Sequence, residues 1–386
     1  MRRSAQPLFR ALPAVVLAIA ASCGSSPAPP VTAQEPALPV DADRKFDDAA
    51  RYLAGLPARD GSIFFAAETD PAWLRHRGAM DELWSHTGRH RLPGYERFQK
   101  AELDGSPFSS GVLFYPFGGP DALTATLLFP RKEGYVLVGL EPPGALPREE
   151  LLAPEEREKW LNGIRYALRS VVRSSFFITS QMRNDLRGRA ADGVLPLLLV
   201  ELVRTGHRIQ GVAQVAIGED GKASLRKSET DGIAGVLVEF SSENENKTRR
   251  LTYFSADLSS PKFDGNKALR AYLESLGTVT TFLKAASYLP HRQGFSGIRD
   301  HILSRSTAIV QDDTGIPFRF FDDAWQVRLY GGYDRPIPSF ARMVQPDLRE
   351  AYGRSERKPL GFHIGYGSGR KPSNLLVATR LPTQGG

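Results

Sequence analysis

The residues of this chain whose positions suggest chemistry are four aspartates, each placed where an apolar segment ends. Every one of them follows a segment that is typical of a β-strand: Asp121, Asp257, Asp312 and Asp313. In an open α/β sheet, binding sites form outside the carboxyl ends of the strands. Carboxylates that converge there could hold a divalent cation or divide the roles of general acid and general base. The alternative is turn chemistry, because Asp after a strand also suits a turn or a helix cap.

A second possible site is a pair of histidines, His86 and His90, in the sequence HTGRH. Two histidines four residues apart share one face of a helix and can bind zinc. However, Gly88 between them indicates a helix that is ending, and the neighbouring Arg89 and Arg91 disfavour a cation. We therefore prefer a solvated helix end to a metal site, and no motif in the sequence predicts a cofactor.

Lys284, Ser287, Tyr288 and His291, in FLKAASYLPH, form a third group. A serine beside a lysine or histidine can act as a nucleophile with its base, and we expect residues 281–288 to be helical. The chain contains no Gly-x-Ser-x-Gly turn that would present such a serine. A polar helix face is the preferred interpretation.

The glycines in residues 365–371, GYGSGRK, precede two cations and could cradle a phosphate through backbone amides. A phosphate-binding fingerprint needs a helix after the glycines, whereas here a proline and a further apolar segment follow. We expect a hairpin loop instead.

Aromatic residues in a Gly- and Pro-rich region could make a binding surface for a glycan or a peptide. These residues are Tyr330, Tyr333, Phe340 and Tyr352. Packing in the core of a large β-rich domain explains them equally well.

The elements that must position these residues surround the stretch from Gly111 to Gly144. Three short apolar segments bounded by Gly, Pro and charged residues predict buried strands at 112–115, 127–129 and 135–138. Helices are expected from Pro71, capped by Asp70, to about Ser85, and over 154–174. The sequence predicts an α/β (or α+β) fold, with helices packed on a mixed β-sheet.

Other segments are assigned from local composition. We expect a core helix or strand at 195–203 and a β-meander over 206–255. Further strands are expected at these segments: 61–65, 308–310, 316–321, 325–330, 362–366 and 375–378.

The N-terminus carries an export signal. Arg2, Arg3 and Arg10 precede a short apolar segment that is too short to span a bilayer, and Cys23 follows it as the only cysteine of the chain. Over these first residues the sequence resembles a bacterial lipoprotein precursor, although Ala20 replaces the usual Leu. The resemblance implies cleavage before Cys23 and attachment of lipid to it. Ordinary secretion with cleavage after Ala33 is the alternative.

The domain organisation follows from the signal. Residues 1–22 are the signal peptide, and 23–41 are a proline-rich tether that cannot bury a core. Residues 42–386 form the globular body, possible halves of which are 42–205 and 206–386.

Composition restricts the partners. The formal net charge of +7 falls to +4 when the three arginines of the signal are removed, which is too mild and too evenly spread to predict a nucleic-acid partner. We expect the protein in the cell envelope, held to a membrane, most simply the outer membrane, by its N-terminal lipid. The leading hypothesis is a non-catalytic binding or scaffolding protein. The alternative is a hydrolase-like enzyme that uses the strand-end carboxylates, with or without a divalent cation.

Overall fold

The structure of the protein is a computed structural model, which describes residues 44–146, 154–174, 193–354, 358–368 and 373–382. The signal, Cys23 and the tether lie outside these residues. Within the described ranges, no helix is both long and apolar enough to cross a membrane.

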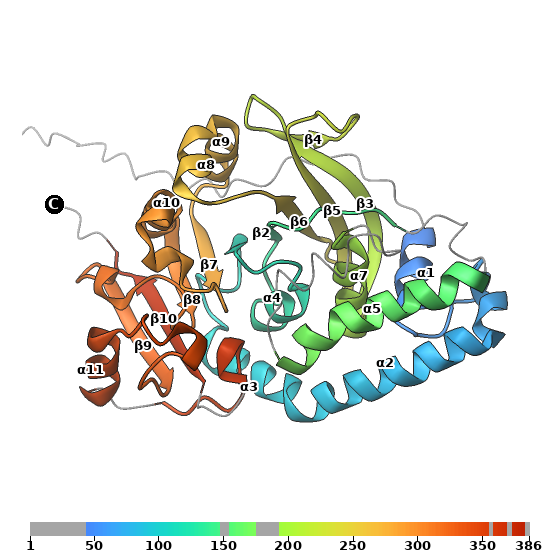
Figure 1. The fold of residues 1–386 in the computed structure, drawn as a ribbon, viewed down its shortest axis with the longest axis horizontal. Coiled ribbons are helices and arrows are strands. Elements are labelled where there is room, and N and C mark those ends of the chain that lie inside the picture. Colours follow the sequence, from blue (N-terminus) through green and yellow to red (C-terminus); the bar gives the residue numbers. More distant parts are fainter. Residues whose placement is uncertain (1–43, 147–153, 175–192, 355–357, 369–372, 383–386) are drawn as a thin grey trace, which may run out of the picture. The chain divides into compact units, whose positions relative to one another are not determined.

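The strands of the described residues form one ten-stranded sheet (Figure 1), in the spatial order β4-β3-β5-β6-β2-β1-β7-β8-β10-β9. Their bounds are β1 (Val112–Pro116), β2 (Gly134–Gly139), β3 (His207–Ile217), β4 (Ala223–Leu225), β5 (Ile233–Ser242), β6 (Arg249–Ser255), β7 (Val279–Leu283), β8 (Ser306–Gln311), β9 (Trp325–Gly331) and β10 (Asn374–Arg380).

The middle of the sheet is parallel and both of its edges are antiparallel. Strands β6, β2, β1, β7 and β8 run in one direction. Antiparallel pairs join β5 to β6 on one side and β10 to β8 on the other. This mixed sheet confirms the α/β prediction, and it interleaves strands from 42–205 with strands from 206–386.

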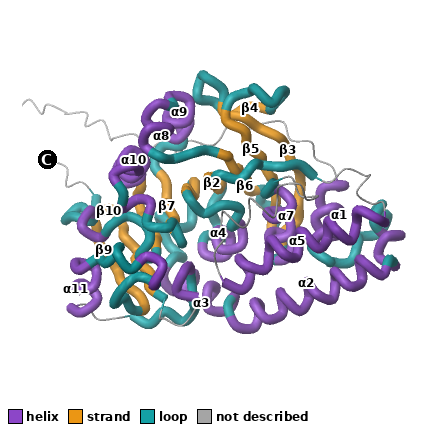
Figure 2. The backbone as a smooth tube through the Cα atoms, viewed as in Figure 1, coloured by secondary structure: helices purple, strands orange, loops and turns teal. Residues whose placement is uncertain are grey.

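Helices cover both faces of the sheet (Figure 2) because the central strands are apolar on both sides. In β1, Leu113 and Tyr115 point to one face, whereas Val112 and Phe114 point to the other. The first face carries α1 (Arg44–Leu53), α2 (Pro71–His90), α3 (Leu92–Glu102), α4 (Ala122–Leu128), α5 (Pro154–Ser174) and α7 (Leu195–Arg204). The second carries α8 (Ser260–Gly265), α9 (Lys267–Ser275), α10 (Ser296–Arg305) and α11 (Pro346–Arg354).

Short 3-10 helices connect the longer elements of the described chain. They are η1 (Phe65–Thr69), η3 (Leu289–His291), η4 (Gln293–Phe295), η5 (Phe318–Phe320), η6 (Pro338–Phe340) and η7 (Gly365–Ser368).

Several local expectations were wrong. Residues 127–129 belong to the buried helix α4 and its end, because a short apolar run has the same composition in a strand and in a core helix. Residues 281–288 begin in strand β7, where Val279, Thr280 and Thr281 supply the β-branched side chains that suit a sheet. Helix α2 continues past Gly88 to His90, so one internal glycine does not end it.

Three expected strands are short helices or turns instead. The segment 61–65 forms turns that lead into η1, 316–321 contains η5, and 362–366 leads into η7. Pro317 lacks the backbone N–H that a strand interior requires, which explains the second case.

The packing of β2 gives a test of the core. Leu137 is fully buried in the middle of the parallel strands, so Leu137→Ala should lower the free energy of unfolding by about 2–5 kcal/mol. The control is Leu381→Ala, at a leucine that is 45% exposed, where urea denaturation should show a change below about 0.5 kcal/mol. Equal effects of the two substitutions would contradict the assignment of β2 to the sheet centre.

Candidate functional site

The chain connections diverge between β1 and β7. Strand β1 continues to β2 through α4 on the first face, whereas β7 continues to β8 through α10 on the second. The loops that follow β1 and β7 therefore leave the sheet on opposite faces. Such a switch point creates a crevice at the carboxyl ends of the strands, where open α/β proteins bind their ligands.

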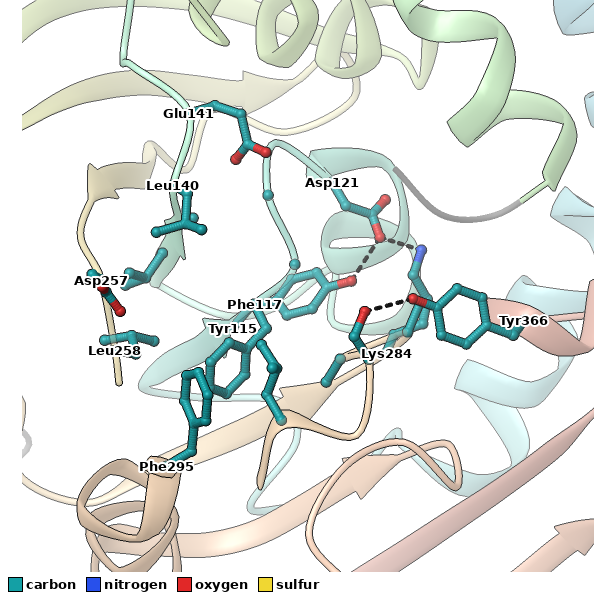
Figure 3. Close-up of a pocket in the computed structure, with 18 of the residues that line it drawn as sticks. Tyr115, Phe117, Asp121, Leu140, Glu141, Asp257, Leu258, Lys284, Phe295 and Tyr366 are labelled. Atoms are coloured by element: carbon teal, nitrogen blue, oxygen red, sulfur yellow. Dashed lines mark hydrogen bonds and ion pairs between the residues drawn. The ribbon is translucent and has the colours of Figure 1, made fainter. Parts of the chain in front are cut away.

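A cavity of about 580 Å³ occupies this crevice (Figure 3). The loops after β1, β2, β6 and β7 line it, together with the segment around Phe340 and with Tyr366. Its volume is within the range of about 300–1,000 Å³ that is usual for small-molecule sites. It is therefore the candidate site.

At the floor of the cavity, Lys284 and Asp121 form a buried ion pair. Their side chains are 2% and 1% exposed. The same Asp121 oxygen accepts a hydrogen bond from the Tyr115 hydroxyl at 2.8 Å, and its other oxygen accepts one from the Thr124 amide at 3.1 Å. Lys284 also donates to the Thr124 hydroxyl at 3.0 Å. Burial alone would raise the pKa of Asp121, but the Lys284 ammonium holds it below the usual range.

Glu201 of α7 lies behind this pair and is fully buried. Its carboxyl group accepts a hydrogen bond from the Leu123 amide at 2.9 Å. Burial raises the pKa of Glu201 well above the usual range, and repulsion from the Asp121 carboxylate raises it further.

Asp312 lies behind the loop that follows β7. It accepts hydrogen bonds from the Ala285 amide at 2.9 Å and from the Thr314 amide at 3.0 Å. Burial and repulsion from Asp313 raise the pKa of Asp312 to about 7. Its hydrogen bonds give it the role of fixing this loop.

Asp313 does not line the cavity. It accepts a hydrogen bond from the Asn374 side chain at 2.8 Å and another from the Tyr288 hydroxyl. Of the four strand-end aspartates, only Asp121 and Asp257 line the cavity.

A further carboxylate of the cavity, Glu141, was missed by the sequence analysis. It lies two residues beyond the end of β2 and is 2% exposed, with the Tyr253 hydroxyl 3.3 Å from its carboxylate. The rule that selected the four aspartates, an acidic residue after a strand, would also have found it. Asp257 follows β6 and is exposed, and one of its oxygens accepts a hydrogen bond from the Ser259 amide at 2.8 Å.

Unfavourable backbone geometry is concentrated in the loops after β1 and β7. Among the described residues, the non-glycine residues with positive φ are Phe117, Ala285, Ser287 and Tyr288, with φ between 51° and 64°. Such conformations cost about 1–3 kcal/mol each and persist where the surrounding structure enforces them. Their position at the switch point indicates that the surrounding structure maintains the cavity shape against the backbone preferences of these four residues.

The group predicted around Ser287 is not on one helix face. Lys284 is held by Asp121, and the Ser287 hydroxyl forms a hydrogen bond of 2.8 Å with the Tyr366 hydroxyl. His291 lies in η3, where burial and the nearby Arg319 lower its pKa to about 4. Ser287 thus lines the cavity beside Tyr366.

The histidine pair lies far along α2, on a solvated part of the helix. The rings of His86 and His90 are 4.8 Å apart. No group of three ligating side chains exists in the described part of the chain, either here or at the strand ends.

Of the four aromatic residues proposed for a binding surface, three are core residues. Tyr330, Tyr333 and Tyr352 are at most 4% exposed, whereas Phe340 is half-buried and lines the cavity. In the glycine-rich segment 365–371, Gly365 and Tyr366 belong to η7, and residues 369–372 lie outside the described chain.

Comparison of the chain with protein-family models, with curated proteins and with solved structures finds no match.

The buried ion pair gives a prediction about stability. Lys284→Met leaves the Asp121 carboxylate buried without its cation and should lower the free energy of unfolding by about 3–5 kcal/mol. The double variant with Asp121→Asn should be less destabilised than Lys284→Met alone. Lys358→Met is the control, because that lysine is half-exposed beside Glu102 and should contribute at most about 1 kcal/mol. Additive losses in the double variant would contradict the pairing.

The raised pKa of Asp312 predicts a pH dependence. Between pH 4 and 7 the folded state holds more protons at this residue than the unfolded state, so stability should fall as the pH rises. The slope from this residue is at most about 1.4 kcal/mol per pH unit. Asp312→Asn should remove that part of the slope in urea denaturation at pH 4.5 and pH 7. Identical slopes for the parent and the variant would show that the Asp312 pKa is not raised.

Proposed function

We propose that the cavity binds a ligand that contains a ribonucleoside. The observation that carries this proposal is the position of Glu141, just after the second of the parallel strands and on the wall of the cavity (Figure 3). In doubly wound nucleotide-binding proteins, an acidic residue near this position, roughly 20 residues after the glycine-rich turn, accepts hydrogen bonds from the ribose hydroxyls. In this chain, Gly118 and Gly119 supply that turn after β1.

The base would lie between apolar side chains next to Glu141. Leu140 is 52% exposed although it is large and apolar, and Leu258 faces the same part of the cavity. Between the loops that carry them, the Asp257 carboxylate can accept a hydrogen bond from an exocyclic amino group such as that of adenine. These side chains lie together at one end of the cavity in Figure 3.

The surroundings of Asp121 disfavour a nucleotide with phosphates. In dinucleotide-binding folds, the pyrophosphate lies against the backbone amides at the start of the first helix. Here the Asp121 carboxylate accepts a hydrogen bond from one of those amides, Thr124, so the protein supplies its own anion. Glu141 and Asp257 add further negative charge to the wall. The ligand is therefore a nucleoside compound without phosphate groups, and the part of it that lies near Asp121 is neutral or cationic.

The strand order suggests which such compound to test first. The part of the sheet from β6 to β9 contains seven strands. Counted along the chain, they lie in the spatial order third (β6), second (β2), first (β1), fourth (β7), fifth (β8), seventh (β10) and sixth (β9), and the seventh is antiparallel to the fifth. The first five positions of this order are those of the doubly wound fold that binds dinucleotides, so adenosine, the nucleoside part of such ligands, is the first compound to test. This is an analogy of topology alone, and it selects a ligand without assigning a reaction.

The hydrolase alternative has less support in the geometry. Asp121 is neutralised by Lys284, and Asp313 does not line the cavity. A binding role needs no uncompensated carboxylate to act as acid or base.

We also propose that the protein is a lipoprotein of the cell envelope, on the sequence around Cys23 and the proline-rich tether that follows it. The two proposals are independent. In an exported protein, the ligand would be a nucleoside compound found outside the cytoplasm.

Calorimetry tests the binding proposal. Adenosine should bind the purified full-length protein more tightly than ATP does. Glu141→Gln should weaken binding about tenfold to a hundredfold, because it replaces a charged hydrogen-bond acceptor. Glu158→Gln, on the exposed side of α5, is the matched control and should have no effect. Tighter binding of ATP, or equal binding by parent and Glu141→Gln, would refute the proposal.

Detergent partitioning tests the anchor. The parent should enter the detergent phase through its lipid, and Cys23→Ser should remain in the aqueous phase because a serine cannot carry the lipid. Mass spectrometry of the N-terminal peptide should show acyl chains on Cys23 in the parent. A mature chain that begins at Gln34 and lacks Cys23 would support secretion with cleavage after Ala33, and an unmodified Cys23 would refute the lipid anchor.

A further inference from the structure

The end of the cavity opposite Glu141 has a different character. Figure 3 shows Tyr366 and Lys284 on this side, away from Leu140 and Asp257. Lys284 is neutralised by Asp121, and the lining residues that contact Tyr366 here, Ser287 and Phe340, carry no charge.

We propose that this end is a second subsite, which takes an uncharged aromatic group carrying one hydroxyl or amino substituent. The inference rests on the proposed function. The nucleoside is assigned to the Glu141 end of the cavity, and the inference assigns the opposite end. The aromatic group belongs to the same ligand or to a second molecule bound beside it.

Aromatic rings line this subsite on one side. The Phe340 ring centroid lies 5.5 Å from that of Tyr366 and 5.1 Å from that of Tyr288. In Figure 3, Phe295 lies instead near Leu258, towards the other end of the cavity. Aromatic rings prefer neighbours in tilted and edge-to-face arrangements, so the wall made by Phe340 and Tyr366 favours a further ring over a flexible chain.

The polar specificity comes from Ser287. Its hydroxyl lies 2.8 Å from the Tyr366 hydroxyl at the wall of the cavity. A hydroxyl can donate one hydrogen bond and accept two. Ser287 therefore retains the capacity to bind a substituent of the ligand while it is bonded to Tyr366.

The loop that carries Ser287 is held in place by buried hydrogen bonds. The Ala285 amide donates to Asp312 at 2.9 Å, and the Ala286 amide donates to the Thr314 hydroxyl at 2.7 Å. These contacts hold the two residues that precede Ser287, whose φ is 53°. A hydroxyl fixed in this way gives a binding site that is organised before the ligand arrives.

The test is an NMR titration of the full-length protein with phenol, toluene and glucose. Phenol should bind, and toluene, which has the same shape without a hydroxyl, should bind more weakly. Ser287→Ala should lower the affinity for phenol about threefold to tenfold, leaving toluene and adenosine unchanged. Phe340→Ala should weaken both phenol and toluene. The matched controls, the exposed Ser85→Ala and Phe65→Ala, should change none of these affinities.

Each outcome separates the two proposals. Adenosine binding without phenol binding, or phenol binding that both cavity variants leave unchanged, would overturn the second subsite. Binding of glucose in place of phenol, lost in Phe340→Ala, would also overturn it by assigning a sugar to this end. Phenol binding that depends on Ser287, without adenosine binding, would support the subsite and refute the nucleoside proposal.

Discussion

The buried ion pair between Lys284 and Asp121 is the interaction on which the rest of the site depends. It joins the loop after β7 to the loop after β1, the two strands between which the chain connections diverge. A lysine and an aspartate that are both almost fully buried are tolerable only together, because either charge alone would be strongly unfavourable in that environment. The pair therefore fixes the floor of the cavity. It also places a carboxylate at the start of α4, which determines the kind of ligand that the cavity can accept.

The cavity walls show how the fold supports this floor. The loops after β1 and β7 contain residues with left-handed backbone conformations, and hydrogen bonds from Ala285 to Asp312 and from Tyr288 to Asp313 hold the second loop. Asp312 and Asp313 thus act on the cavity indirectly. Asp312 binds the backbone of the loop after β7, and Asp313 binds the Tyr288 side chain of the same loop. The result is a cavity with carboxylates at one end and neutral aromatic residues at the other, both formed by loops at one edge of a rigid sheet.

The sequence predicted the class of the fold, and the strand ends that it singled out lie at the edge of the sheet that carries the cavity. Apolar segments ending in aspartate identified β1, β6 and β8, because parallel strands end at the same edge. Their partners could not be predicted, since Lys284 meets Asp121 only after the chain has built six further strands. The helical assignment of 281–288 hid the loop that carries Ser287, and a short apolar segment does not distinguish strand from helix. Glu141 was visible in the sequence but was not selected.

The most direct test of the nucleoside proposal is an experimental structure of the protein crystallised with adenosine. We predict that the ribose hydroxyls lie within hydrogen-bonding distance of the Glu141 carboxylate, with the base next to Leu258 and its amino group directed at Asp257. Adenosine bound elsewhere, or a cavity filled by adenosine with the ribose turned away from Glu141, would contradict the account.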